Sequence, residues 1–396
     1  MRLDPVVHDS PLVNSLKAGV DFRRKLVDQG HSVRNAADDL CDSAERLAEL
    51  VNQCFWTSMH VEENRAVRGS LCVCSPDQAP RARALYEPVP LSVKSLVTLM
   101  IASPRSSLAV HASMTGVEIW GVLDAIPMHT LSLRITDTGT VVASEGRDVI
   151  AVLERGEVYL PSSASDIDLT LLVAKALDKT KTFPERAKLA ARIQRIVVAM
   201  HRQGHGGALL IVPTSTDDWK ADVSFNFRFD DFGAMAVLKR ISELEDAETR
   251  HSNLKKGIDR ETPVSLLPMF EQSIQAHRDL LDALLSSIGE LSAVDGAVVM
   301  DEELKVIGFG TKLQANTDCF QVLTLDALSK EIVNIPYMQL GGTRHQSAAR
   351  FVYKNPEAMA FVASQDGRLT LLAWVLDRGQ VVAVRRLEHF VWDCLR

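Results

Sequence analysis

Two segments decide the fold of the C-terminal half of the chain: AVDGAVVMDEELKVIGFGTKL (residues 293–313) and LGGTRHQSAAR (residues 340–350). In the first segment, an apolar run, an acidic turn and a second apolar run predict two strands joined by a hairpin. In the second, two glycines and a threonine precede a run that is compatible with a helix. The sequence therefore predicts a carboxylate, Asp295, at the entrance to a strand and a glycine-rich turn at the start of a helix.

The glycine-rich turn has the chemistry of a phosphate site. A helix N-terminus offers unpaired N–H groups and a partial positive charge, and Gly342 lets the backbone approach a ligand closely. Arg344 adds a fork of donors that matches phosphate oxygens, and Thr343 can cap the helix or bind an oxygen. On spacing alone, an ordinary glycine-rich loop with a threonine N-cap and a solvated Arg344–His345 pair is the simpler explanation.

The order of these motifs resembles that of the diadenylate cyclase (DAC) domain, in which a DGA motif on a strand is followed by an RHR motif before a helix. Residues 295–297 (DGA) and 342–345 (GTRH) carry the resemblance. It extends to residues 205–212, which are similar to the first core strand of the family, and to residues 359–367, which are similar to the strand and turn after its RHR helix. The likeness covers roughly the C-terminal half of the chain.

The resemblance implies an enzyme that condenses two ATP molecules into cyclic di-AMP with release of pyrophosphate. It implies a homodimer or larger oligomer with active sites face to face, and a Mg²⁺ or Mn²⁺ ion held by Asp295. The implied catalytic residues are Asp295, Arg344 and His345. The implied nucleotide-binding residues are Gly296, Ala297, Gly342, Thr343, Arg344, His345 and Gln346.

The sequence departs from the family pattern at three places. Gln346 stands where the family has a second arginine, Val294 where a histidine is common, and Ser364-Gln365 where many members carry glutamates. Loss of one cationic phosphate contact removes roughly 1–3 kcal/mol of binding free energy. Two further interpretations therefore stay open: a nucleotide-binding sensor or receptor with weak or no turnover, and a scaffold whose N-terminal region binds a partner protein.

Composition and the chain's beginning narrow the class of protein. A 46% hydrophobic and 24% charged content over 396 residues is typical of a globular protein, and the net charge of -7 disfavours non-specific nucleic-acid binding. The six cysteines lack zinc-site spacing and indicate a reducing cytoplasm. The first ten residues do not resemble a signal peptide, and the apolar window 91–114 is interrupted by charges. We expect a cytoplasmic protein with neither a membrane nor a nucleic-acid partner.

The pattern along the chain predicts three parts. Residues 1–75 form a helical segment with an amphipathic helix over 36–55. Residues 76–165 hold short β-prone runs between Gly-containing turns and form a small β-rich module, which resembles the sensor regions that accompany such cyclases. Residues 166–396 form the DAC-like domain. The predicted fold class is α/β (α+β), with a mixed sheet flanked by helices in the C-terminal part.

One alternating stretch has two interpretations. In residues 222–229 the three phenylalanines Phe225, Phe227 and Phe229 occupy every second position, so a strand would place them on one face. Sheet core is the interpretation that we favour, and stacking on an adenine base is the alternative.

Overall fold

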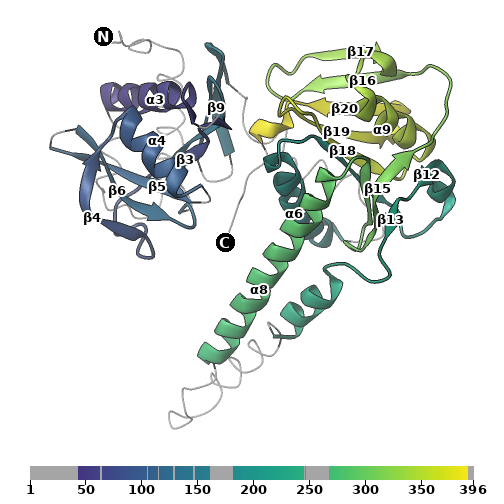
Figure 1. Cartoon of the computed structure of the whole chain (residues 1–396), viewed down its shortest axis with the longest axis horizontal. Coiled ribbons are helices and arrows are strands. Elements are labelled where there is room, and N and C mark those ends of the chain that lie inside the picture. The colour runs from purple at the N-terminus through teal and green to yellow at the C-terminus, as the bar shows by residue number, and fades with distance from the viewer. Residues whose placement is uncertain are drawn as a thin grey trace. The chain divides into compact units, whose positions relative to one another are not determined.

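The structure, a computed structural model, describes residues 43–390 apart from 63–64, 105, 115, 128–129, 146–147, 161–181, 245 and 247–266 (Figure 1). The chain divides into two compact units, with the boundary between residues 167 and 168. Each unit is built on a mixed sheet with helices packed against it. The predicted α+β fold class is therefore confirmed.

The sheet of the first unit has eight strands in the order β10-β9-β8-β7-β3-β5-β6-β4, and only β3 and β5 are parallel neighbours. Short turns join most of the antiparallel neighbours. The strands are β3 (Gly69–Val73), β4 (Arg83–Pro90), β5 (Ser107–Ser113), β6 (Gly116–Leu123), β7 (Leu131–Asp137), β8 (Thr140–Glu145), β9 (Asp148–Glu154) and β10 (Glu157–Tyr159). A separate hairpin joins β1 (Val61–Glu62) to β2 (Arg65–Ala66).

Two helices pack against this sheet and share its core. Helix α3 (Ala44–Ser58) contacts β7 and β8, whereas α4 (Val93–Ala102) contacts β3 and β5. Serine side chains cap both helices: Ser43 accepts a hydrogen bond from the Arg46 N–H at 3.3 Å, and Ser92 forms a capping box with Ser95. Because α3 and the sheet bury one common cluster of apolar residues, they form a single packing unit.

Strands β1 to β4 lie where the sequence pattern predicted none, and β1 and β2 fall in the segment that was predicted to be helical. Strand β3 falls in the segment that was predicted to be helical, and β4 falls in the stretch after a predicted joint. The departures at β3 and β4 have a physical reason. Strand β3 is only five residues long, and β4 is an exposed edge strand with two prolines, Pro88 and Pro90, so it lacks an apolar alternation.

The sheet of the second unit has the order β12-β15-β14-β11-β18-β19-β20-β16-β17, with β13 also paired to β15. Strand β11 is parallel to β14, and β16 is parallel to β20. The other neighbours are antiparallel. The strands are β11 (Gly207–Val212), β12 (Val223–Ser224), β13 (Phe227–Arg228), β14 (Ala297–Asp301), β15 (Val306–Leu313), β16 (Gln321–Asp326), β17 (Ile332–Pro336), β18 (Met359–Ala363), β19 (Leu369–Val375) and β20 (Gln380–Arg385).

Helix α9 (Thr343–Lys354) packs on the centre of this sheet, against β18, β19 and β20 (Figure 1). Its apolar side chains share a core with alternate residues of β11, including Leu210 and Val212. Leu209 and Ile211 point to the opposite face of β11 and are also buried. The central strands are therefore covered on both faces, as expected for strands that are apolar throughout.

Two long helices pair beside the sheet. Helix α6 (Phe183–Arg202) contacts β11 and β18, and α8 (Leu267–Glu290) packs along α6. An ion pair between Arg195 and Asp282 joins the two helices. None of the helices that the structure describes has a stretch long and apolar enough to cross a bilayer.

The phenylalanine stretch does not form the predicted core strand. It contains only the two-residue strands β12 and β13, which pair with β15 at the edge of the sheet. The side chain of Phe227 is half exposed and stacks on Phe309 with ring centroids 4.9 Å apart. The sheet-core interpretation is therefore wrong for Phe227. Its strand lies at the edge of the sheet, so neighbouring side chains cover only one side of the Phe227 ring.

Candidate functional site

Asp295 and Arg344, the first two candidate site residues in the sequence, are in contact in the structure. Asp295 lies in the short connection from α8 to β14, two residues before the strand begins, and Arg344 lies in the first turn of α9. The Arg344 Nη2 atom donates a hydrogen bond to the Asp295 carboxylate at 3.2 Å. The Asp295 side chain is 98% exposed, so this ion pair contributes little to stability and leaves the carboxylate accessible to a ligand.

Gly296 makes this exposed position of Asp295 possible. Its φ of +115° lies in a region that side-chain-bearing residues rarely adopt. A Cβ at this position would lie 2.5 Å from the Gly310 carbonyl carbon and 2.8 Å from the Thr311 nitrogen. The next residue, Ala297, is buried in the core and pairs with β11 on one side and β15 on the other, so its side chain is not accessible to a ligand.

The N-terminus of α9 has no side-chain cap. Gly342 is the N-cap residue, and Thr343 is the first helical residue rather than the cap. The loop with a Thr343 N-cap, which spacing alone favoured, is therefore not what forms. A Cβ on Gly342 would meet no atom within 4 Å, so open space lies in front of this residue. The first N–H groups of the helix remain available for an anion.

The Gln346 side chain forms hydrogen bonds with the backbone of the glycine turn, which the sequence did not predict. Its side-chain Nε2 donates hydrogen bonds to the carbonyl oxygens of Met338 and Gly341, both at 2.9 Å. The amide therefore ties the glycine turn to the first turn of α9. The predicted contact of Gln346 with the nucleotide stays a prediction, and any such contact would come from a side chain whose Nε2 is bound to the backbone of the turn.

His345 lies beneath the glycine turn and is buried. Its Nε2 lies 3.3 Å from the hydroxyl of Thr370, a residue of β19. Burial lowers the pKa of His345 below its ordinary value of 6.5, and the positive charge of Arg385 lowers it further, while Asp366 acts in the opposite direction. A neutral imidazole can hydrogen-bond to a phosphate or orient its neighbours, but it adds no positive charge at neutral pH.

The lowered pKa of His345 predicts a dependence of stability on pH. The unfolded chain, with a His345 pKa near 6.5, takes up the proton before the folded chain does. The free energy of unfolding should therefore fall as the pH drops below about 6.5 and level off below the folded pKa. Urea unfolding at pH 5 to 8 should show a smaller decrease for His345→Gln than for the unchanged protein. Parallel pH profiles for the two proteins would show that His345 is not the group responsible.

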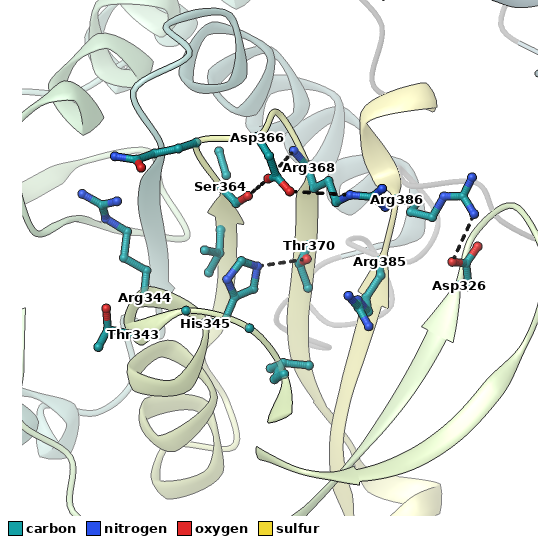
Figure 2. Close-up of a pocket in the computed structure, with 16 residues that line it drawn as sticks. Asp326, Thr343, Arg344, His345, Ser364, Asp366, Arg368, Thr370, Arg385 and Arg386 are labelled. Carbon is teal, nitrogen blue, oxygen red and sulfur yellow. Dashed lines mark hydrogen bonds and ion pairs between the residues drawn. The ribbon is translucent and has the colours of Figure 1, made fainter. Parts of the chain in front are cut away.

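A cavity of about 620 Å³ opens beside the start of α9 and continues across the ends of three strands. It is lined by the glycine turn and by residues at the ends of β16, β18 and β20 and the start of β19, and its volume is within the range of small-molecule sites. Figure 2 shows Thr343 and Arg344 on one side of the His345–Thr370 pair, and Arg385 and Arg386 on the other. The charged or hydroxyl-bearing lining residues are Asp326, Thr343, Arg344, Ser364, Asp366, Arg368, Thr370, Arg385 and Arg386.

Four guanidinium groups therefore share one cavity. Of these, sequence reasoning identified only Arg344. The consecutive arginines Arg385 and Arg386 follow a predicted strand, and this pattern could have indicated a cationic site. The sequence does not give the order of the strands in the sheet, which places the end of that strand near α9. Ser364 was noted as a departure from the family and lines the cavity.

The candidate donor for a divalent cation at this site is the carboxylate of Asp295. Among the described residues, no group of three or more His, Cys, Asp or Glu side chains is arranged to hold a metal ion. The exposed Asp295 carboxylate is a single oxygen donor, which suits Mg²⁺ or Mn²⁺ when phosphate oxygens and water complete the coordination shell. The donor set thus fits a metal that arrives with a nucleotide.

The comparisons with known proteins concern the first unit. A family described as "Probable sensor domain DACNV" matches residues 37–124, a stretch that includes α3, α4 and strands β3 to β6. No curated protein matches the chain. The family match supports a sensor region at the N-terminal end, in agreement with the function expected for the β-rich module.

Proposed function

We propose that the second unit is a nucleotide cyclase that condenses two ATP molecules into cyclic di-AMP, under the control of the first unit as a sensor. The observation that carries the proposal is the pairing of Asp295 with Arg344 in front of an uncapped helix N-terminus. The cavity beside it supplies further guanidinium groups for a polyphosphate. The resemblance to the DAC motifs and the match of residues 37–124 to a probable sensor domain support the same assignment.

The reaction requires positioning and charge neutralisation more than covalent chemistry from the protein. The 3′-oxygen of each ATP forms a bond to the α-phosphorus of the other, and the bond from that phosphorus to the bridging oxygen breaks. Two pyrophosphates leave, and the two hydroxyl protons pass to solvent. Since each nucleotide attacks the other, two chains must present their sites face to face, which a symmetric homodimer or larger oligomer achieves.

Each residue at the site has a place in this scheme. Asp295 would hold the cation and orient the attacking ribose, and Arg344 with the N–H groups of α9 would neutralise the phosphate charge. When bound, Mg²⁺ or Mn²⁺ supplies additional positive charge at the reacting phosphate. Neutral His345 supports the turn from beneath, since its ring lies against Gly341 and Thr370.

A second function, nucleotide binding without turnover, is favoured by one observation. Gln346 replaces a cation of the family motif, and its amide is bound to the backbone carbonyls of Met338 and Gly341. A site with less positive charge can still bind ATP but stabilises the developing charge of the transition state less well. The protein would then act as a receptor for an adenine nucleotide.

The experiment that separates the two functions is product analysis. The full chain is incubated with ATP and Mg²⁺ or Mn²⁺, and the products are resolved by chromatography and mass. A cyclase yields cyclic di-AMP and pyrophosphate in a ratio of one to two. ATP that binds and is recovered unchanged, at concentrations where dimers are present, would exclude the cyclase and leave the receptor.

A further inference from the structure

Three of the four guanidinium groups in the cavity already have carboxylate partners. Arg344 pairs with Asp295 at 3.2 Å, Arg368 with Asp366 at 3.7 Å, and Arg386 with Asp326 at 3.5 Å. Arg385, which lies at the end of β20, is exposed and has no carboxylate partner within the part of the chain that the structure describes. An unpaired guanidinium that lines a cavity is available to an anion from solution.

The acidic side chains near Arg385 are committed elsewhere. One oxygen of Asp326 accepts hydrogen bonds from the N–H groups of Leu328 and Ser329, both at 2.9 Å, and the other pairs with Arg386. Burial acts to raise the pKa of Asp326, but these N–H donors and the charge of Arg386 outweigh it and hold the pKa below 3.8. Asp326 therefore stays ionised and bound to groups other than Arg385.

Asp366 is committed in the same way. It accepts a hydrogen bond from the Ser364 hydroxyl and pairs with Arg368 through its second oxygen. The positive charge of Arg385 nevertheless acts on the site, because it contributes to the lowered pKa of His345. Arg385 thus lies near His345, on the side of the His345–Thr370 pair away from Arg344 in Figure 2.

We propose that Arg385 binds the terminal phosphates of the nucleotide and supplies the cation that is absent at position 346. The proposal rests on the proposed function, since it assumes that the nucleotide's α-phosphate is held at the start of α9 by Arg344. A phosphate chain that begins there and follows the cavity past Thr370 ends at Arg385. Arg385 would then distinguish a nucleoside triphosphate from a monophosphate, because only the triphosphate is long enough to reach it.

Titration calorimetry on the full chain with ATP, AMP and inorganic tripolyphosphate tests this assignment. Arg385→Gln should weaken ATP and tripolyphosphate binding about tenfold and change AMP binding less than about twofold, as expected for one charge-assisted contact. Arg385→Lys should retain part of the ATP affinity because it keeps the charge. Arg378→Gln, which removes an exposed arginine at the other end of the β19–β20 hairpin, should change none of the three affinities.

The outcomes separate this inference from the proposed function. If ATP binds and Arg344→Gln weakens it, but Arg385→Gln leaves the ratio of ATP to AMP affinity unchanged, the role of Arg385 is wrong and the nucleotide site stands. If the unchanged protein binds neither ATP nor tripolyphosphate, both proposals are wrong. Thermal unfolding of each variant confirms that lost affinity does not reflect lost folding.

Discussion

Asp295→Asn should reduce the formation of cyclic di-AMP by at least about 100-fold, because the amide cannot hold a divalent cation against the reacting phosphate as a carboxylate does. The fold should survive the change. The Asp295 side chain is 98% exposed, and within the described residues it accepts a hydrogen bond only from Arg344. The melting temperature should therefore change by no more than about 2 °C. Product formation and thermal unfolding measure the two effects.

Two comparisons make the Asp295 result specific. Glu303→Gln removes an exposed carboxylate at the opposite end of β14 and should leave turnover unchanged. Calorimetry should show that Asp295→Asn still binds ATP in the absence of metal, since Arg344 and the start of α9 remain. Equal turnover by Asp295→Asn and the unchanged protein would remove Asp295 from the mechanism.

Gly296→Ala should lower the free energy of unfolding by about 2–4 kcal/mol, the combined effect of backbone strain and overpacking. The φ of +115° disfavours any side chain, and the new methyl group would press on the backbone of Gly310 and Thr311. Neither backbone can move freely, because β15 is paired on both sides by β14 and by β12 and β13. Urea unfolding monitored by circular dichroism measures the loss.

Gly342→Ala is the matched control for Gly296→Ala. Its φ of -68° is ordinary and the new methyl group would meet open space, so the loss should stay below about 1 kcal/mol, the effect of an alanine N-cap. Similar losses for both variants would mean that neither the backbone conformation nor the close packing at Gly296 makes a special contribution to stability.

Local patterns predicted the parts of the site that lie within continuous segments. Apolar runs and glycine signals located β11, β14 and β18. The order of the motifs placed Asp295 and Arg344 in one site, and in the structure the two side chains form a hydrogen bond. In the first unit, short β-prone runs between Gly-containing turns located β5 to β10. These elements are encoded within a few residues, so a single sequence is sufficient to find them.

Features that depend on strand order were not predictable in this way. Arg385 and Asp326 join the cavity because β20 lies between β19 and β16, a neighbour relation that no local period encodes. The burial of His345 and the two hydrogen bonds of Gln346 depend on how α9 packs on the sheet. The exposed ring of Phe227 follows from its place on an edge, which alternation alone does not reveal.

The most direct test of the nucleotide site is the affinity of the full chain for ATP, measured by calorimetry with and without Arg344→Gln. ATP binding should be saturable, and Arg344→Gln should weaken it at least about tenfold, because Arg344 is the guanidinium group at the start of α9. ATP binding that is unaffected by Arg344→Gln would place the nucleotide elsewhere. No binding by the correctly folded, unchanged protein would contradict both the cyclase and the receptor.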